Sequence, residues 1–178
     1  MGDKLERIFE YRVLYAKERE LQIPLSTQEA SRLERLRHQL PSRVPSVDDR
    51  DPFTLLTTPL PVQFVAAGRF GAGVLRNASA VGLAVATGEP PELGQRLIVH
   101  VQEPLHGLEY TFPCRVVSRV VKGITSMGLV FEGVPSQTRI GGRSSGVWRQ
   151  DTSPMDTSPK LRAEDDTVPN LRGTGSRG

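Results

Sequence analysis

The stretch 77–82, which reads NASAVG, places an Asn, a Ser and a Gly between two apolar segments, and these polar residues are the best candidates for chemistry in the sequence. An Asn carboxamide offers a donor and an acceptor, and a Ser hydroxyl offers both in one group. The same residues also build turns, because Asn and Ser side chains bond their own backbone and Gly tolerates positive φ. The spacing therefore predicts either a ligand site at Asn77, Ser79 and Gly82 or a tight crossover between strands.

Pairs of residues that would catalyse a reaction are harder to find. The three histidines, His38, His100 and His106, stand at no metal-binding spacing, and no Gly-x-Ser-x-Gly elbow is present. The single cysteine, Cys114, lies in an apolar segment and is typical of a buried small hydrophobe. The glycine-rich stretch 68–73 is not followed by Lys-Ser or Lys-Thr, so it predicts a hairpin turn. We expect no enzyme and no metal site.

Composition narrows the class of protein further. The net charge of +3 is spread along the 178 residues without a basic patch, which argues against DNA binding. No apolar run approaches the roughly 18 residues of a membrane span. The N-terminus lacks an apolar signal core, and one cysteine allows no internal disulfide, so we expect a cytoplasmic protein. A hydrophobic content of 37% indicates that part of the chain does not pack.

The elements that must position the polar stretch begin with two helices. Residues 3–22 form helix-favouring sequence that ends before Pro24, and Ser26 with Glu29 makes a capping box that opens a second helix to about Leu40. Residues 1–40 therefore predict a helical hairpin. Each helix has a narrow apolar stripe, so the hairpin either packs on itself or on the following domain, or it forms a homodimer or partner interface.

The rest of the chain divides into three segments. Residues 41–58 carry three prolines and several acids and predict a linker. Residues 59–135 alternate with period two in six short segments separated by turns, which predicts a mainly β fold with a six-stranded antiparallel barrel. Residues 136–178 predict a disordered tail, in which Ser153 and Ser158 precede prolines as candidate phosphorylation sites and Trp148 is a candidate docking anchor.

Several residues together resemble the PilZ domain, a bacterial receptor module for cyclic di-GMP. The stretch 77–82 matches Asp/Asn-x-Ser-x-x-Gly between the second and third predicted strands. GLAVAT (82–87), FPCRVVSRV (112–120) and SMGLVFEGV (126–134) agree with the segments that follow it. The resemblance covers about residues 59–135 and implies a PilZ-like β-barrel in which Asn77, Ser79 and Gly82 line a guanine-binding edge.

The second motif of the PilZ family, Arg-x-x-x-Arg before the first strand, is absent. The corresponding window, residues 52–64, contains no basic residue, and Arg43 and Arg50 upstream stand seven apart among acidic residues. Each lost charge-assisted phosphate contact costs about 1.5–3 kcal/mol of binding free energy. We therefore favour an adaptor with weak or lost nucleotide binding, which contacts protein partners in motility, polarity or other bacterial signalling. The alternative is a functional cyclic di-GMP receptor. No resident cofactor is expected in either case.

Overall fold

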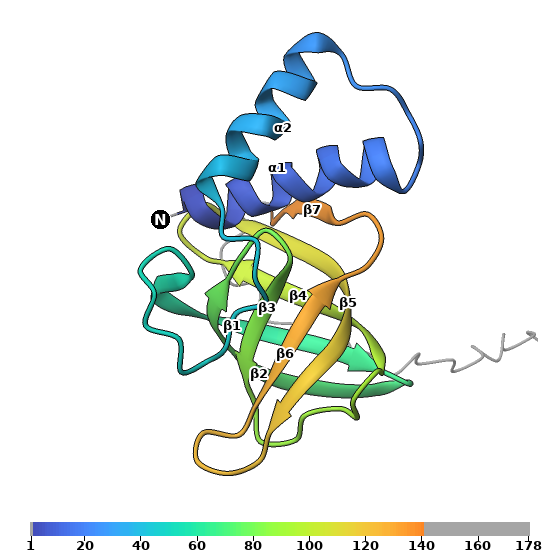
Figure 1. Ribbon diagram of the computed structural model, residues 1–178. Coiled ribbons are helices and arrows are strands. Elements are labelled where there is room, and N and C mark those ends of the chain that lie inside the picture. Colours follow the sequence, from blue (N-terminus) through green and yellow to red (C-terminus); the bar gives the residue numbers. More distant parts are fainter. Residues whose placement is uncertain (1, 141–178) are drawn as a thin grey trace, which may run out of the picture. The chain divides into compact units, whose positions relative to one another are not determined.

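The computed structural model describes residues 2–140, in which two helices precede seven strands (Figure 1). The helices are α1 (Gly2–Arg19) and α2 (Thr27–Gln39). The strands are β1 (Leu55–Ala66), β2 (Arg69–Ala78), β3 (Gly82–Ala86), β4 (Arg96–Glu103), β5 (Leu108–Val120), β6 (Ser126–Phe131) and β7 (Ser136–Arg139). Neither helix in this part of the chain is apolar enough over a sufficient length to cross a membrane.

The predicted capping box at the start of α2 is confirmed. The backbone N–H of Glu29 donates to Ser26 Oγ, and the Ser26 N–H donates back to the Glu29 carboxylate. Lys17 on α1 donates to the same carboxylate at 2.6 Å, and these bonds lower the pKa of Glu29 to about 2. Glu29 of the capping box is therefore also one of the links between the two helices.

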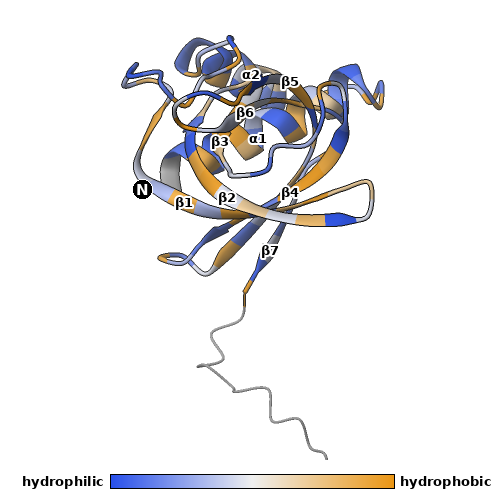
Figure 2. Ribbon diagram, turned by 90° about the horizontal axis from the view of Figure 1, so that it is seen from below, coloured by the Kyte–Doolittle hydropathy of each residue, from blue (hydrophilic) through white to orange (hydrophobic). Residues whose placement is uncertain are grey.

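Six strands close into the predicted antiparallel barrel. They follow one another around the ring as β4-β1-β2-β3-β6-β5, and the pairing of β4 with β5 completes the ring. Inward positions such as Val62, Phe64 and Ala66 on β1 are buried, and the positions between them are more exposed. Figure 2 shows this alternation as orange and blue bands along the strands. The fold class predicted from sequence periodicity is confirmed.

Two expected segment boundaries differ from the structure. β1 begins at Leu55, inside the predicted linker 41–58, and its first part contains a register shift between Leu55 and Leu60. A proline in such an irregular segment removes no regular ladder bond, so Pro59 is compatible with a strand. β7 lies inside the predicted tail 136–178 and pairs with the start of β5, although all four of its residues are exposed and polar. The tail residues beyond 140, including Trp148, Ser153 and Ser158, lie outside the described residues.

The helical hairpin packs on the barrel, which confirms the first of the two alternatives for residues 1–40. α1 lies across one end of the barrel, beside β5 and β7 (Figure 1), and the view along the barrel shows it behind the opening (Figure 2). Leu5 and Ile8 of α1 and Leu36 of α2 belong to the same buried cluster as the barrel interior. The ring of Phe9 lies 5.6 Å from that of Tyr110 on β5. A homodimer through these helices stays a prediction.

Arg12 is a buried charged residue on α1 that fastens the helix to the barrel. Its guanidinium donates to the Glu20 carboxylate at 2.8 Å and to the backbone carbonyl of Gly133 at 3.0 Å. It also lies over the rings of Tyr15 and Phe131, at 5.1 and 5.6 Å from their centres. One side chain thus connects α1 to the chain segment that follows β6.

Replacing Arg12 with Ala should lower the free energy of unfolding by about 2–4 kcal/mol, because a buried side chain is removed and a backbone carbonyl and a carboxylate each lose a charged donor. Urea denaturation followed by circular dichroism measures the loss. Arg119, an exposed residue of β5, is the control, and its replacement with Ala should change stability by less than about 0.5 kcal/mol. Equal effects of the two substitutions would show that Arg12 does not hold α1 on the barrel.

Candidate functional site

The stretch 77–82 forms the crossover from β2 to β3, and Ser79 organises it. Ser79 Oγ accepts hydrogen bonds from the backbone N–H groups of Val81 and Gly82, each at 3.2 Å. The Ser79 N–H in turn donates to the Gly82 carbonyl at 2.9 Å. The Ser79 side chain has no exposed surface. Its bonds are those of a tight turn, the second of the two structures that the sequence pattern predicts.

Gly82 lies where β3 comes closest to β6. A Cβ atom at this position would stand 1.8 Å from the backbone oxygen of Leu129, an impossible distance that only movement of a strand could relieve. Residue 82 pairs directly with Val130 in this ladder. The glycine therefore allows two central strands of the barrel to approach each other, whatever else it does.

Asn77 is completely buried and holds the linker rather than facing solvent. Its Nδ2 donates to two linker carbonyls, and the backbone N–H groups of Ala78 and Ala80 donate to two more, each at 2.9 Å. The four acceptors are the carbonyl oxygens of Pro41, Ser46, Asp49 and Thr54. Asn77 Oδ1 has no hydrogen-bond donor among the described residues. The motif and the linker thus form one hydrogen-bonded unit.

The linker carboxylates bind Arg43, one of the two arginines upstream of the window that lacks the Arg-x-x-x-Arg motif. Arg43 Nη2 lies 2.6 Å from an oxygen of Asp49 and 3.0 Å from an oxygen of Asp51. The Asp51 N–H donates to the Asp49 carboxylate, and this bond, with that from Arg43, lowers the pKa of Asp49. The Phe53 N–H and then Arg43 lower the pKa of Asp51 in the same way. One terminal nitrogen of Arg43 is therefore held by two internal carboxylates, while the side chain stays 55% exposed.

Three further arginines of the linker and β2 are dispersed. Arg50 is exposed in the linker, and Arg76 is a half-buried residue of β2 next to Asn77. Arg69 begins β2, eight positions before Asn77, so at about 3.3 Å per residue it stands at the far end of the strand. The structure therefore brings Asn77, Ser79 and Gly82 together but surrounds them with backbone carbonyls rather than guanidinium groups.

Among the described residues, no three His, Cys, Asp or Glu side chains gather as they would around a metal ion. Cys114 is buried inside the barrel, where desolvation raises the pKa of its thiol. His106 lies 2.7 Å from a Glu103 oxygen, and His100 lies 3.2 Å from the Thr111 hydroxyl. These contacts are local pairs within and between β4 and β5.

Comparison with known proteins agrees with this strand order and with the position of the motif. A family model described as PilZ domain matches residues 48–141, more than half of the chain. The chain belongs to the PilZ domain family. It is accordingly a signalling protein of the cyclic di-GMP-binding family, whose domains are binding modules rather than enzymes. A search of curated proteins found no match to the chain.

Sequence reasoning missed the largest part of this PilZ site, the four linker carbonyls that face the motif. Carbonyl oxygens belong to every residue, so no residue type marks them. The available signal was indirect: the turn-forming residues of 41–54 end shortly before β1, which pairs with β2 through Leu55 and Asn77. A linker that leads into that pairing must pass close to the end of β2.

Replacing Gly82 with Ala should lower the free energy of unfolding by about 1–3 kcal/mol, because the added methyl group collides with backbone rather than with a movable side chain. Gly88 is the matched control, since a Cβ there meets nothing within 4 Å among the described residues. Thermal denaturation of the two variants compares them. Equal stability would show that β3 and β6 are not as close as the structure places them.

Acid should loosen the linker from the PilZ motif. Asp49 and Asp51 have lowered pKa values in the folded protein, so protons bind preferentially to the unfolded linker. The stabilisation they give is fully present at neutral pH and is lost as the pH falls below about 4. The NMR shift of the Asn77 side-chain amide should move with this titration in the natural sequence and not in an Asp49→Asn, Asp51→Asn variant. Unchanged shifts in the natural protein down to pH 3 would contradict this coupling.

Proposed function

We propose that this PilZ protein is a cytoplasmic adaptor that regulates bacterial motility or polarity through protein contacts, with weak or lost binding of cyclic di-GMP and no enzyme activity. The observation that carries the proposal is the occupation of the motif by the linker. Asn77, Ala78 and Ala80 already donate to four linker carbonyls. A nucleotide that used these donors would first have to displace the linker.

The expected effect on affinity follows from these bonds. A typical internal hydrogen bond contributes about 1 kcal/mol to stability, so releasing four costs about 4 kcal/mol. That cost lowers the apparent affinity for a nucleotide roughly a thousandfold. The ligand would gain little in return, because residues 52–64 contain no arginine and Arg43 is bound to Asp49 and Asp51.

A second candidate function is a cyclic di-GMP receptor in which the nucleotide replaces the linker. One observation favours it: Asn77 Oδ1 is buried without a donor among the described residues, and such a group is unusual in a folded protein. The N–H groups of a guanine base would satisfy that oxygen. In this alternative Asn77 and Ser79 contact the base after the linker has moved, and Gly82 keeps β3 close to β6.

Titration calorimetry with cyclic di-GMP at low salt separates the two functions. The adaptor proposal predicts no heat of binding with the full chain at about 100 µM, in the natural sequence and in an Asp49→Asn, Asp51→Asn variant whose linker is weakened. The receptor alternative predicts binding that becomes tighter in that variant and is lost on Ser79→Ala. Micromolar binding with this pattern would overturn the adaptor proposal.

A further inference from the structure

The outer face of the barrel carries a continuous row of apolar residues on the side away from the motif. Phe70 pairs with Val65, Val65 with Ile98, and Ile98 with Pro113, so the row crosses β2, β1, β4 and β5. We call these four residues the outer apolar row. Phe70 is 87% exposed and Ile98 38% exposed, so both side chains are accessible on this face. β4, at the middle of the row, is three strands from β3 in both directions around the ring.

Two arginines border the outer apolar row and share one carboxylate. Arg96 on β4 and Arg115 on β5 are directly paired residues, and Glu132 lies beside them after β6. Arg96 Nε donates to one Glu132 oxygen at 2.9 Å, and Arg115 Nε donates to the other at 2.6 Å. Both side chains remain exposed, Arg96 by 83% and Arg115 by 47%.

The bonds among Arg96, Arg115 and Glu132 leave hydrogen-bond donors for another molecule. Each arginine uses only its Nε atom toward Glu132, so the terminal nitrogen atoms of both guanidinium groups have no protein acceptor within the described part of the chain. Guanidinium groups recognise carboxylates through such paired N–H donors. Two arginines with one glutamate also leave a net charge of +1 at this edge.

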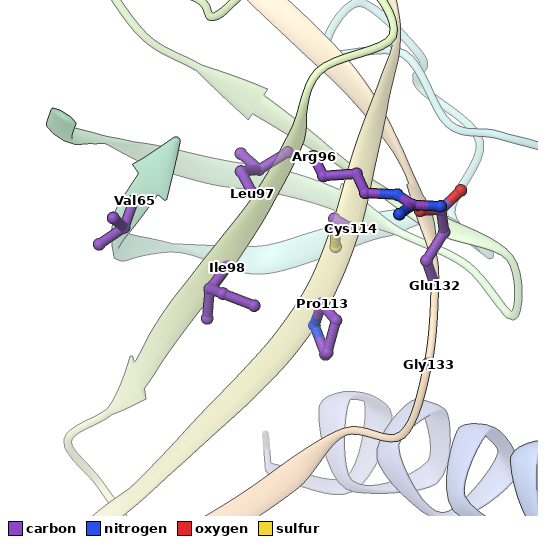
Figure 3. Close-up of a pocket in the computed structure, with 8 residues that line it drawn as sticks. All are labelled: Val65, Arg96, Leu97, Ile98, Pro113, Cys114, Glu132 and Gly133. Carbon is purple, nitrogen blue, oxygen red and sulfur yellow. The ribbon is translucent and has the colours of Figure 1, made fainter. Parts of the chain in front are cut away.

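Val65, Ile98 and Pro113 of the outer apolar row line an open hollow of about 470 Å³ together with Arg96 and Glu132. Figure 3 shows Val65, Ile98 and Pro113 along its floor, and Arg96 extending toward Glu132 at its rim. An apolar floor with a few convergent polar groups is the usual form of a binding site. The exposed aromatic ring of Phe70 at one end of the row is the kind of residue that dominates protein interfaces.

We propose that this face binds an acidic and apolar segment of a partner protein, with a partner carboxylate held by Arg96 and Arg115 and an apolar side chain packed on the outer apolar row. The proposal rests on the adaptor function proposed above and names the chemistry of its partner. Charge complementarity selects the occupant, because the donors at the rim need an acceptor that the described chain does not supply. The motif lies at the junction of β2 and β3, at the other end of β2 from Phe70, and plays no part in this contact.

A second copy of this chain fits the surface less well. A two-fold dimer would place the same patch against itself, so Arg96 and Arg115 of one copy would face those of the other. Juxtaposed like charges oppose such pairing. A partner with carboxylates meets no such repulsion.

The test is an NMR titration of the full ¹⁵N-labelled chain with a synthetic peptide. The peptide has the central sequence Glu-Leu-Asp-Phe-Glu, and a matched peptide carries Gln and Asn in place of its acids. We expect the acidic peptide to shift the backbone signals of β1, β4 and β5 with a dissociation constant of about 0.1–1 mM, and the neutral peptide to bind at least tenfold more weakly. Arg96→Ala and Phe70→Ser should each weaken binding about tenfold, and Arg119→Ala should leave it unchanged.

Three results would overturn the proposal: no shifts at about 5 mM acidic peptide, equal binding of the neutral peptide, or binding that Arg96→Ala and Phe70→Ser do not affect. Sedimentation of the natural chain as a dimer that Phe70→Ser dissociates would assign the face to a second copy instead. Binding of cyclic di-GMP in the calorimetric titration is a separate outcome. Such binding would contradict the proposed adaptor function, but it would not shift the NMR signals of β4. The two proposals therefore fail on different observations.

Discussion

The fold around the motif depends on the hydrogen bonds between the linker and the end of β2. Asn77, Ala78 and Ala80 supply the donors, and the linker supplies four carbonyls. These bonds determine where residues 41–54 run and how the chain enters β1 beside β2. They also use the N–H donors of the motif, so these donors already have partners inside the chain.

Charged side chains are also bound by partners within the chain. Arg43 is held by Asp49 and Asp51, and Arg12 is buried between α1 and the segment after β6. Arg96 and Arg115 share a single carboxylate, and each uses only Nε in its bond to Glu132. The terminal nitrogen atoms of these two arginines therefore remain accessible at the edge formed by β4 and β5. The proposed adaptor function requires both features, a surface for protein contact and a motif whose donors are bonded to the linker.

Much of the fold could be predicted from sequence because its signals are local. The capping box at Ser26 and Glu29, and the period-two alternation of Val62, Phe64 and Ala66, depend only on neighbouring residues. β7 could not be predicted, because four exposed polar residues carry no alternation and the strand exists only through its pairing with β5. The candidate residues Asn77, Ser79 and Gly82 do lie together, but their contacts are with distant backbone atoms. The Ser46 carbonyl that accepts from Asn77 lies 31 positions away in the sequence. Because every residue has a backbone carbonyl, no residue type predicts such a contact.

Amide hydrogen exchange at Ala78 and Ala80 tests the central claim most directly, because their N–H groups donate to the linker carbonyls of Thr54 and Pro41. If the linker occupies the motif, both amides exchange slowly in the protein without nucleotide, at rates close to those of core amides in β3, and cyclic di-GMP leaves these rates unchanged. Rapid exchange of both amides in the free protein, with protection appearing only when cyclic di-GMP is added, would contradict the account.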